Sequence, residues 1–274
     1  MTGTAADVAA LLDLTVLDDD VFTVPVAPAR PGDTVQMRAF GGQVAGQALR
    51  AACRTVDPGR PPHSMHAYFI RPGRPDEPVR LDVARSRDGR TFSTRHVTAA
   101  QGGKPIFELI ASFHDPEPGH AWQSGTRPDV PPPDRLERSA LPSFFRYPGG
   151  FDIRLVNPSE PTAFPVRHPF WIRLSEPVGD DPALHASLIA YLTDMAVVSS
   201  AIAPDSRITL GTAVSLDHTV WFHRPARVDA WLLYSVDPVI NHGARGLARG
   251  HLHTLDGALV ASVAQEVLLR PADA

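Results

Sequence analysis

The sequence has little cysteine, little lysine, no excess of positive charge and no long apolar run. Cys53 is the only cysteine, which excludes a disulfide framework and a Cys-x-x-Cys metal site. Lys104 is the only lysine, so the positive charge is almost all arginine, a side chain suited to bidentate phosphate binding. The net charge of −4 argues against a broad nucleic-acid-binding surface.

Signals for targeting and for membrane insertion are also missing. No stretch approaches the roughly 20 apolar residues of a membrane span. Residues Met1–Leu12 lack the basic leader and the sustained apolar run of a signal peptide. We therefore expect a cytoplasmic protein with no membrane span and no nucleic-acid partner.

Several catalytic motifs are absent as well. There is no G-x-S-x-G elbow, which argues against an α/β-hydrolase, and neither a phosphate loop nor G-x-G-x-x-G, so we expect no cofactor. His251 and His253 share one strand face, but a metal site needs three or four ligands, so we interpret them as surface histidines and expect no metal. Cys53, at a helix end, is interpreted as a small core or surface residue rather than a nucleophile.

The most informative feature that is present is an internal repeat. Ser64–Pro72 reads like Ser215–Pro225, and in both an alternating aromatic segment ends in Arg-Pro. Arg71 and Arg224 are 153 residues apart, and two later glycine pairs, Gly89 with Gly243 and Gly103 with Gly257, are each 154 apart. A separation held over three landmarks predicts two copies of one fold.

Each copy shows a helix followed by strands. Gly41 and Gly42 open a small-residue helix, Gln43 to about Arg54, and Asp181-Pro182 opens a second, whose apolar stripe runs from Leu184 to Ile202. Alternating runs and glycine turns predict strands at 21–26, 63–70, 79–86, 91–101, 104–114, 168–174, 212–223, 228–237, 243–254 and 259–269.

Between the copies lies a segment rich in proline, from Asp115 to Gly150, which breaks regular structure and is interpreted as a linker. The predicted domains are therefore residues 1–115, a linker at 116–150, and residues 151–274. The expected fold class is α+β, with two antiparallel sheets each wrapped round a long helix.

Three polar residues of the second copy stand in apolar surroundings. Asp194 has apolar helix neighbours, and a buried unpaired charge costs several kcal/mol, so it needs donors or a chemical role. Ser215 lies on an alternating strand, on the face of Asp217 and opposite that of His218. Gln265 interrupts an apolar run and must be hydrogen-bonded if it points inward. Taken alone, Asp194 is interpreted equally well as a satisfied core carboxylate, Ser215 is interpreted as a structural strand serine, and Gln265 also fits a satisfied core polar group.

Together, a carboxylate, a hydroxyl and an amide have the groups needed to hold a water molecule. The first copy offers Gln47 near the level of Asp194, Ser64 near Ser215, and Ser112 or Phe113 near Gln265, with no carboxylate. We therefore expect one competent site and one degenerate copy.

At these residues the chain resembles the type II acyl-CoA thioesterases, a double hot-dog family. The resemblance implies that Asp194, Ser215 and Gln265 form the catalytic set, and that the protein is a homodimer or homotetramer. It rests on four segments: Phe40–Ala48, His63–Gly73, Ser215–Pro225 and Ala264–Glu266.

The expected function is hydrolysis of fatty acyl-CoA to free fatty acid and CoA by an activated water. Arg71, Arg224 and Arg245 are candidates for binding the CoA phosphates. Two alternatives stay open: a hot-dog enoyl-CoA hydratase that uses an Asp/His pair, with His218 or His223 supplying the imidazole, and a non-catalytic acyl-CoA-binding protein.

Overall fold

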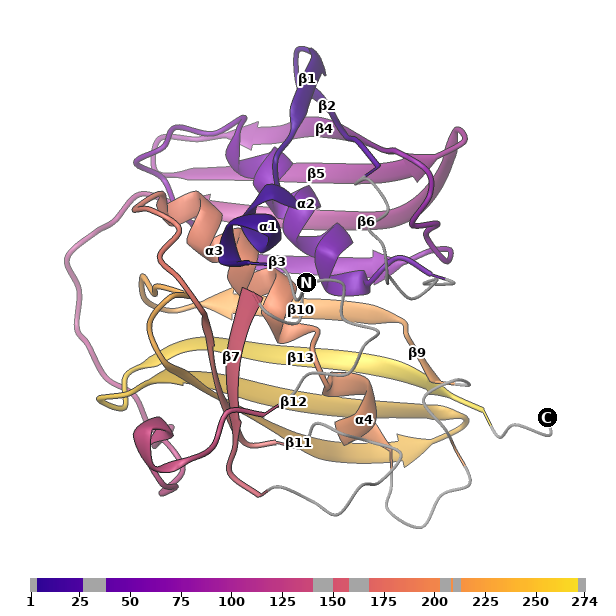
Figure 1. Ribbon diagram of the computed structural model, residues 1–274. Helices are drawn as coiled ribbons and strands as arrows, with labels where there is room; N and C mark the ends of the chain where they lie inside the picture. The colour runs from indigo at the N-terminus through magenta and orange to yellow at the C-terminus, as the bar shows by residue number, and fades with distance from the viewer. Residues whose placement is uncertain are drawn as a thin grey trace.

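The computed structural model describes residues 4–26, 38–139, 150–157, 168–202, 208 and 213–270. Within these residues the strands form one antiparallel sheet in the order β1-β2-β4-β5-β6-β3-β10-β13-β12-β11-β8-β7, with β9 beside β13 (Figure 1). The two halves of the chain meet where β3 (Pro62–Phe69) pairs with β10 (Asp217–Phe222). The halves therefore lie edge to edge and share one sheet.

The predicted strands are confirmed to within a few residues, except that the segment predicted as 212–223 is divided into β9 and β10. The remaining strands are β1 (Thr15–Asp18), β2 (Val21–Val24), β4 (Val79–Asp88), β5 (Phe92–Gln101), β6 (Lys104–His114), β7 (Phe151–Leu155), β8 (Phe170–Leu174), β9 (Ala213–Ser215), β11 (Leu232–His242), β12 (Arg245–Thr254) and β13 (Leu259–Leu269). Helix α1 (Ala5–Ala10), β1 and β7 were not predicted, because they are too short to show a period.

Strand register confirms the internal repeat. Met65 pairs with Ala111 across β3 and β6. Adding 153 to each β3 residue number and 154 to each β6 residue number gives the residue pairs that β10 forms with β13. A one-residue shift in pairing occurs between Pro62 and Ser64 in the first copy, and another at the corresponding place between β9 and β10. The two copies therefore share even their irregularity.

Helices α2 (Gly41–Cys53) and α3 (Pro182–Thr193) lie side by side on the same face of the sheet (Figure 1). They run antiparallel, because the end of α2 forms an ion pair with the start of α3, Arg50 to Asp181 at 2.7 Å. Two glycines of α2 allow the close approach: a Cβ on Gly42 would lie 2.3 Å from the Tyr191 carbonyl oxygen, and one on Gly46 would lie 2.8 Å from that of Ser187.

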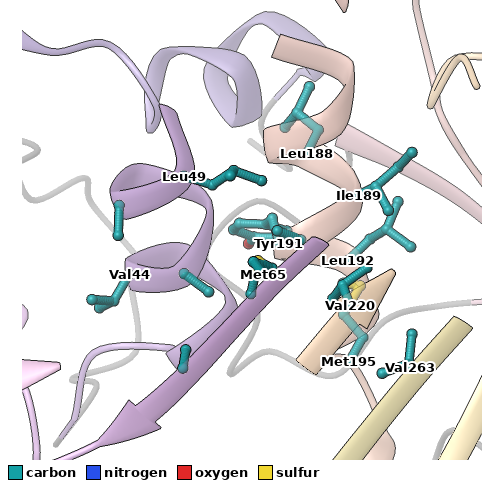
Figure 2. Close-up of a cluster of buried hydrophobic side chains, with 14 of the residues drawn as sticks. Val44, Leu49, Met65, Leu188, Ile189, Tyr191, Leu192, Met195, Val220 and Val263 are labelled. Carbon is teal, nitrogen blue, oxygen red and sulfur yellow. The ribbon is translucent and has the colours of Figure 1, made fainter. Parts of the chain in front are cut away.

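The core fills the space between these two helices and the sheet. Figure 2 shows side chains of α2 and α3 meeting Met65, Val220 and Val263 of the central strands. Leu188 and Leu192 of α3 are each about 1% exposed. Burying an aliphatic side chain of this size stabilises the fold by about 1.5–3 kcal/mol, so the packing holds both helix ends in fixed positions.

The second helix is shorter than predicted. The apolar stripe continues to Ile202, but α3 ends at Thr193, and a separate helix, α4 (Val197–Ala201), follows. Ala196 between them is left-handed, with φ of 61°. The left-handed conformation of an alanine costs about 1–2 kcal/mol. No glycine or proline in the sequence marks this break. Its consequence is that Asp194 lies at the C-terminal cap of α3.

The described part of the predicted linker packs against the second half of the chain. The Gln123 Nε2 donates to the carbonyl oxygen of Gly257, and the Trp171 indole N–H donates to that of Pro131 at 2.9 Å. A short 3-10 turn, η1, spans Pro133–Arg135. Residues 140–149 lie outside the described residues. None of the helices described is long and apolar enough to cross a membrane.

Candidate active site

The structure brings the three candidate residues of the second half together. Asp194 caps α3, Ser215 ends β9, and Gln265 lies in the middle of β13. The Gln265 Nε2 lies 2.9 Å from Asp194 Oδ1 and 2.7 Å from Ser215 Oγ. Gln265 is fully buried and Asp194 is 7% exposed. Gln265 points inward, on the same strand face as the buried Val263 and Val267, and it is hydrogen-bonded there, as expected for an inward amide.

Asp194 also accepts a hydrogen bond from a backbone donor that the sequence did not reveal. The backbone N–H of Gly42, at the start of α2 in the other half of the chain, donates to Asp194 Oδ2 at 2.7 Å. A Cβ on the preceding residue, Gly41, would lie 2.8 Å from the same oxygen. The positive end of the α2 dipole therefore faces the carboxylate, which favours its charged form. The site is built from both halves.

Burial raises the pKa of Asp194 to about 6, and the hydrogen bonds from Gln265, Gly42 and Ser215 oppose that shift. At neutral pH the carboxyl is mostly ionised, yet its pKa lies close enough to 7 for it to accept a proton. These are the properties of a general base.

The predicted face of Ser215 is wrong. Ser215 pairs with Val267, but Thr219 pairs with Ala264, so one extra residue lies between β9 and β10. Such a bulge moves a side chain to the other face of the sheet. Ser215 and His218 consequently both face Gln265, although strict alternation places them on opposite sides.

His218 is the polar neighbour of the site that the sequence did not assign to it. It is fully buried, its Nδ1 is 2.6 Å from Gln265 Oε1, and its Nε2 is 3.0 Å from Thr193 Oγ1. Burial lowers its pKa to about 4, so the ring is neutral at pH 7. The sequence signal that could have identified His218 was a polar residue at the strand position opposite an inward-pointing amide. His223, the other imidazole considered, bonds Ser262 near the other end of β10.

The corresponding positions of the first half are apolar. The register places Met65 where His218 lies and Ala111 where Gln265 lies, so the expected counterparts Ser64, Ser112 and Phe113 are wrong by one or two residues. Gln47, the expected counterpart of Asp194, instead donates to the Leu11 carbonyl oxygen at 2.8 Å.

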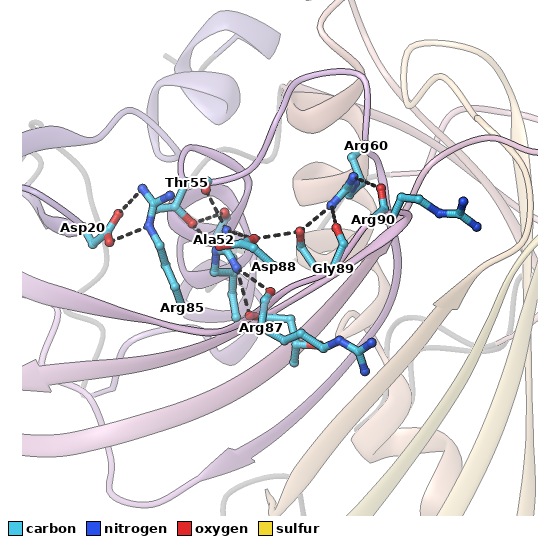
Figure 3. Close-up of polar contacts among 12 residues, drawn as sticks. Asp20, Ala52, Thr55, Arg60, Arg85, Arg87, Asp88, Gly89 and Arg90 are labelled. Carbon is cyan, nitrogen blue, oxygen red and sulfur yellow. Dashed lines mark hydrogen bonds and ion pairs between the residues drawn. The ribbon is translucent and has the colours of Figure 1, made fainter.

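A different polar cluster occupies the end of α2. The Arg95 guanidinium is 1% exposed and bonds Thr55 Oγ1 at 2.8 Å and Asp88 Oδ1 at 2.7 Å. Figure 3 shows Thr55 and Asp88 together with the Arg87 carbonyl oxygen, which also accepts from Arg95. Each donor of this cluster is used in holding backbone and side chains together, which indicates a structural role.

The three candidate arginines lie at different ends of the sheet. Arg71 lies two residues after the end of β3, where the Phe69 N–H donates to the Leu216 carbonyl oxygen, and Arg245 pairs with Leu268, three residues from Gln265. Both are near the Ser215 end of the sheet. Arg224 follows β10, nine residues beyond Ser215, which is roughly 30 Å along a strand.

The remaining candidates show no sign of chemistry. His253 is 2% exposed, so its predicted surface position is wrong. Burial raises the pKa of the Cys53 thiol to about 12, which keeps it protonated. Among the described residues, no group of three His, Cys, Asp or Glu side chains is placed to hold a metal ion.

Comparison with known proteins gives two family matches, one in each half. Residues 21–114 match a family model described as the acyl-CoA thioesterase N-terminal domain, and residues 161–268 match one described as acyl-CoA thioesterase. Human acyl-coenzyme A thioesterase 8 is 36% identical, with 96% of this chain and 88% of that protein covered. Acyl-CoA thioesterase 2 of Haemophilus influenzae is 33% identical, with 95% of this chain and 96% of that protein covered.

Solved structures agree with the sequence relatives. The acyl-CoA thioesterase II TesB2 of Mycobacterium marinum superposes with a TM-score of 0.79 at 36% identity, over 98% of this chain and 99% of that one. A protein of unknown function with a hot-dog fold, from Alicyclobacillus acidocaldarius, has a TM-score of 0.76 at 19% identity, over 95% of this chain and 97% of that one. The predicted α+β double hot-dog fold is confirmed.

Proposed function

The chain belongs to the acyl-CoA thioesterase II family, and from that premise we propose that it hydrolyses fatty acyl-CoA with a water molecule held by Asp194, Ser215 and Gln265. It is a thioester hydrolase, with acyl-CoA as its substrate class. The observation that supports the catalytic set is the pair of bonds from one buried amide to Asp194 and Ser215.

The proposed reaction needs no covalent intermediate. The Asp194 carboxylate takes a proton from water as the water oxygen attacks the thioester carbonyl. The tetrahedral oxyanion then collapses, the carbon–sulfur bond breaks, and the CoA thiolate leaves with the electron pair. The thiolate then takes the proton from Asp194, which restores the carboxylate. Because Ser215 Oγ accepts from Gln265, its own hydroxyl proton is free to donate to the water or to Asp194.

The alternative hydratase has less support. A hydratase of this fold needs an acid and a base in contact with one substrate, but both nitrogens of His218 are engaged, by Gln265 and by Thr193. A low pKa also keeps this ring neutral. Absorbance loss with crotonyl-CoA, without release of thiol, would favour the hydratase.

For binding of CoA we propose Arg71 and Arg245, which lie near the Ser215 end of the sheet. Arg71 donates to the Pro105 carbonyl oxygen, and Arg245 bonds Glu266 at 2.8 Å, so within the described part of the chain both retain donors without a partner. Charge reversal of either should raise KM more than it lowers kcat. Arg224, at the other end of β10, is the matched control, and we expect its reversal to leave KM nearly unchanged.

The first experiment is thiol release, followed with a chromogenic disulfide reagent, over acyl-CoAs of increasing chain length. We expect the wild type to turn over and Asp194→Asn to fold normally but lose about 10²–10⁴-fold in kcat, the usual cost of losing a general base. The chain length with the highest kcat/KM defines the natural substrate class.

A serine outside the proposed site gives the control. Ser215→Ala should lower kcat, whereas Ser64→Ala, in the other copy, should leave it unchanged. An Asp194→Asn enzyme with nearly full activity would remove the carboxylate from the mechanism and leave the three residues as a structural cluster.

A further inference from the structure

His218 is buried beside the proposed site, but the reaction as written gives it no role. It does not contact Asp194 through any hydrogen bond among the described residues. It bonds Gln265 Oε1 through Nδ1 at 2.6 Å and Thr193 Oγ1 through Nε2 at 3.0 Å. Thr193 is the last residue of α3, immediately before Asp194. His218 therefore connects the end of that helix to the amide at the centre of the site.

The Gln265 amide has two orientations, which differ in whether nitrogen or oxygen faces the carboxylate. With Nε2 toward Asp194 and Ser215, both amide protons have acceptors, at 2.9 Å and 2.7 Å. In the flipped orientation, Oε1 lies against the ionised carboxylate, and two acceptors repel each other in a buried site. The productive orientation leaves Oε1 facing His218 Nδ1, which must then be a donor.

We propose that His218 is a positioning residue, neutral and protonated on Nδ1, that locks the Gln265 amide with its nitrogen toward Asp194 and Ser215. In this arrangement the Thr193 hydroxyl, whose one proton can also reach the Ile189 carbonyl oxygen at 2.8 Å, donates it to Nε2 instead. Nδ1–H then donates to Oε1, and the amide donates to the carboxylate. All three donors point in one direction, so each bond strengthens the next. Burial lowers the pKa of the ring to about 4, which agrees with a neutral imidazole.

The internal repeat supports this role. The register places Met65 and Ala111 at the positions of His218 and Gln265. The first half, which has no carboxylate at the end of its helix, thus has apolar residues in place of both the histidine and the glutamine. Histidine is therefore not needed to pack this position of the fold. It occurs where there is an amide to orient.

The direct test is the tautomer of His218 in the intact protein. Long-range ¹H–¹⁵N correlation on histidine-labelled protein at pH 7 should show a protonated Nδ1 and a bare Nε2, with the signal assigned by its loss in His218→Asn. A proton on Nε2 alone, or on both nitrogens, would overturn the proposal. This readout does not depend on activity.

The kinetic test uses two variants of similar size. His218→Leu removes the donor, and we expect it to lower kcat about ten-fold with KM within about two-fold, since one hydrogen bond is lost but substrate binding is not. His218→Asn can place an amide N–H where Nδ1–H was, and should stay within about three-fold of the wild type. Equal losses in both variants would assign only a packing role to the ring.

Met65→Leu is the matched control, because it changes the corresponding position of the first half. It should alter the melting temperature but not kcat. If His218→Leu fails to fold, the tautomer still decides the proposal. The positioning role rests on the proposed function, whereas the tautomer does not: full activity in Asp194→Asn would refute the site and leave the tautomer result standing.

Discussion

Asp194 is a buried acid whose hydrogen bonds do not restore its ordinary pKa. Its donors are the Gln265 amide, the Gly42 N–H and the Ser215 hydroxyl, yet burial still raises its pKa to about 6. Two other titratable groups lie next to it. Burial lowers the pKa of His218 to about 4, and burial together with the charge of Asp194 raises the pKa of Tyr234 well above its usual range. Of these three groups, only Asp194 should change charge between about pH 5 and pH 9.

The pH dependence of the rate follows from this. A general base works when deprotonated, so kcat/KM should be flat above about pH 7 and fall toward ten-fold per unit below the Asp194 pKa of about 6. The measurement is kcat/KM for one acyl-CoA over this range, with stability checked at each pH. A profile that stays flat down to pH 4.5 would show that a different group limits the rate.

Two of the site residues could be predicted because they break an apolar pattern. Asp194 and Gln265 are polar at positions where the helix and strand periods require apolar side chains, and that contrast is readable from the sequence. The face of Ser215 could not be read, because a bulge leaves no mark in composition. The Gly42 N–H was invisible for a different reason: it is a backbone group, brought to Asp194 by tertiary packing.

At the scale of elements, the break after α3 determines where the carboxylate lies. In a continuous helix, Asp194 would lie on the side of the helix, among the apolar residues three and four positions away in the sequence. Instead Ala196 is left-handed, and the Tyr234 hydroxyl donates to the freed Thr193 carbonyl oxygen. This tertiary hydrogen bond satisfies a carbonyl oxygen at the end of α3. The apolar stripe alone predicts that the helix continues past this point.

The packing of α2 on α3 gives a prediction about two glycines one turn apart. An alanine Cβ at Gly42 or Gly46 would lie within 2.8 Å of a carbonyl oxygen of α3, so each change should force the helices apart. We expect each to cost about 1–3 kcal/mol, or several degrees in melting temperature. Only Gly42 donates to Asp194, so Gly42→Ala should also lower kcat.

Gly46→Ala is the control for that pair, measured by thermal unfolding and by thiol release on the same samples. It should lose stability and keep kcat per folded molecule. Equal kcat losses in the two variants would mean that helix spacing, not the Gly42 N–H, sets the activity.

On the scale of the whole molecule, the repeat holds one candidate site rather than two, because the two copies differ at their helix ends. The second half has a carboxylate there, held by an amide and a hydroxyl. The first half has the buried Arg95, whose donors are used by Thr55, Asp88 and nearby carbonyl oxygens. In the proposed mechanism, the first half contributes the start of α2, whose Gly42 N–H donates to Asp194.

This division of labour predicts that neither half works alone. Residues 116–274 contain Asp194, Ser215 and Gln265, but they lack the Gly42 N–H, the β3 partner of β10 and the α2 surface that covers α3. Without α2, helix α3 would expose apolar side chains that are now at most 3% exposed, among them Leu188, Ile189 and Leu192. Exposing that surface costs more than the isolated half can recover.

We therefore expect fragments 1–115 and 116–274 to be inactive and poorly folded when produced separately, and to regain thiol release when produced together. Circular dichroism and gel filtration of each fragment, beside the mixture, measure folding, and the chromogenic assay measures activity. The cut falls at the start of the Pro-rich segment, where no strand pairing is interrupted. Hydrolysis by fragment 116–274 alone at a rate near that of the whole chain would contradict the shared site, because it would show that Asp194 needs no donor from the first half.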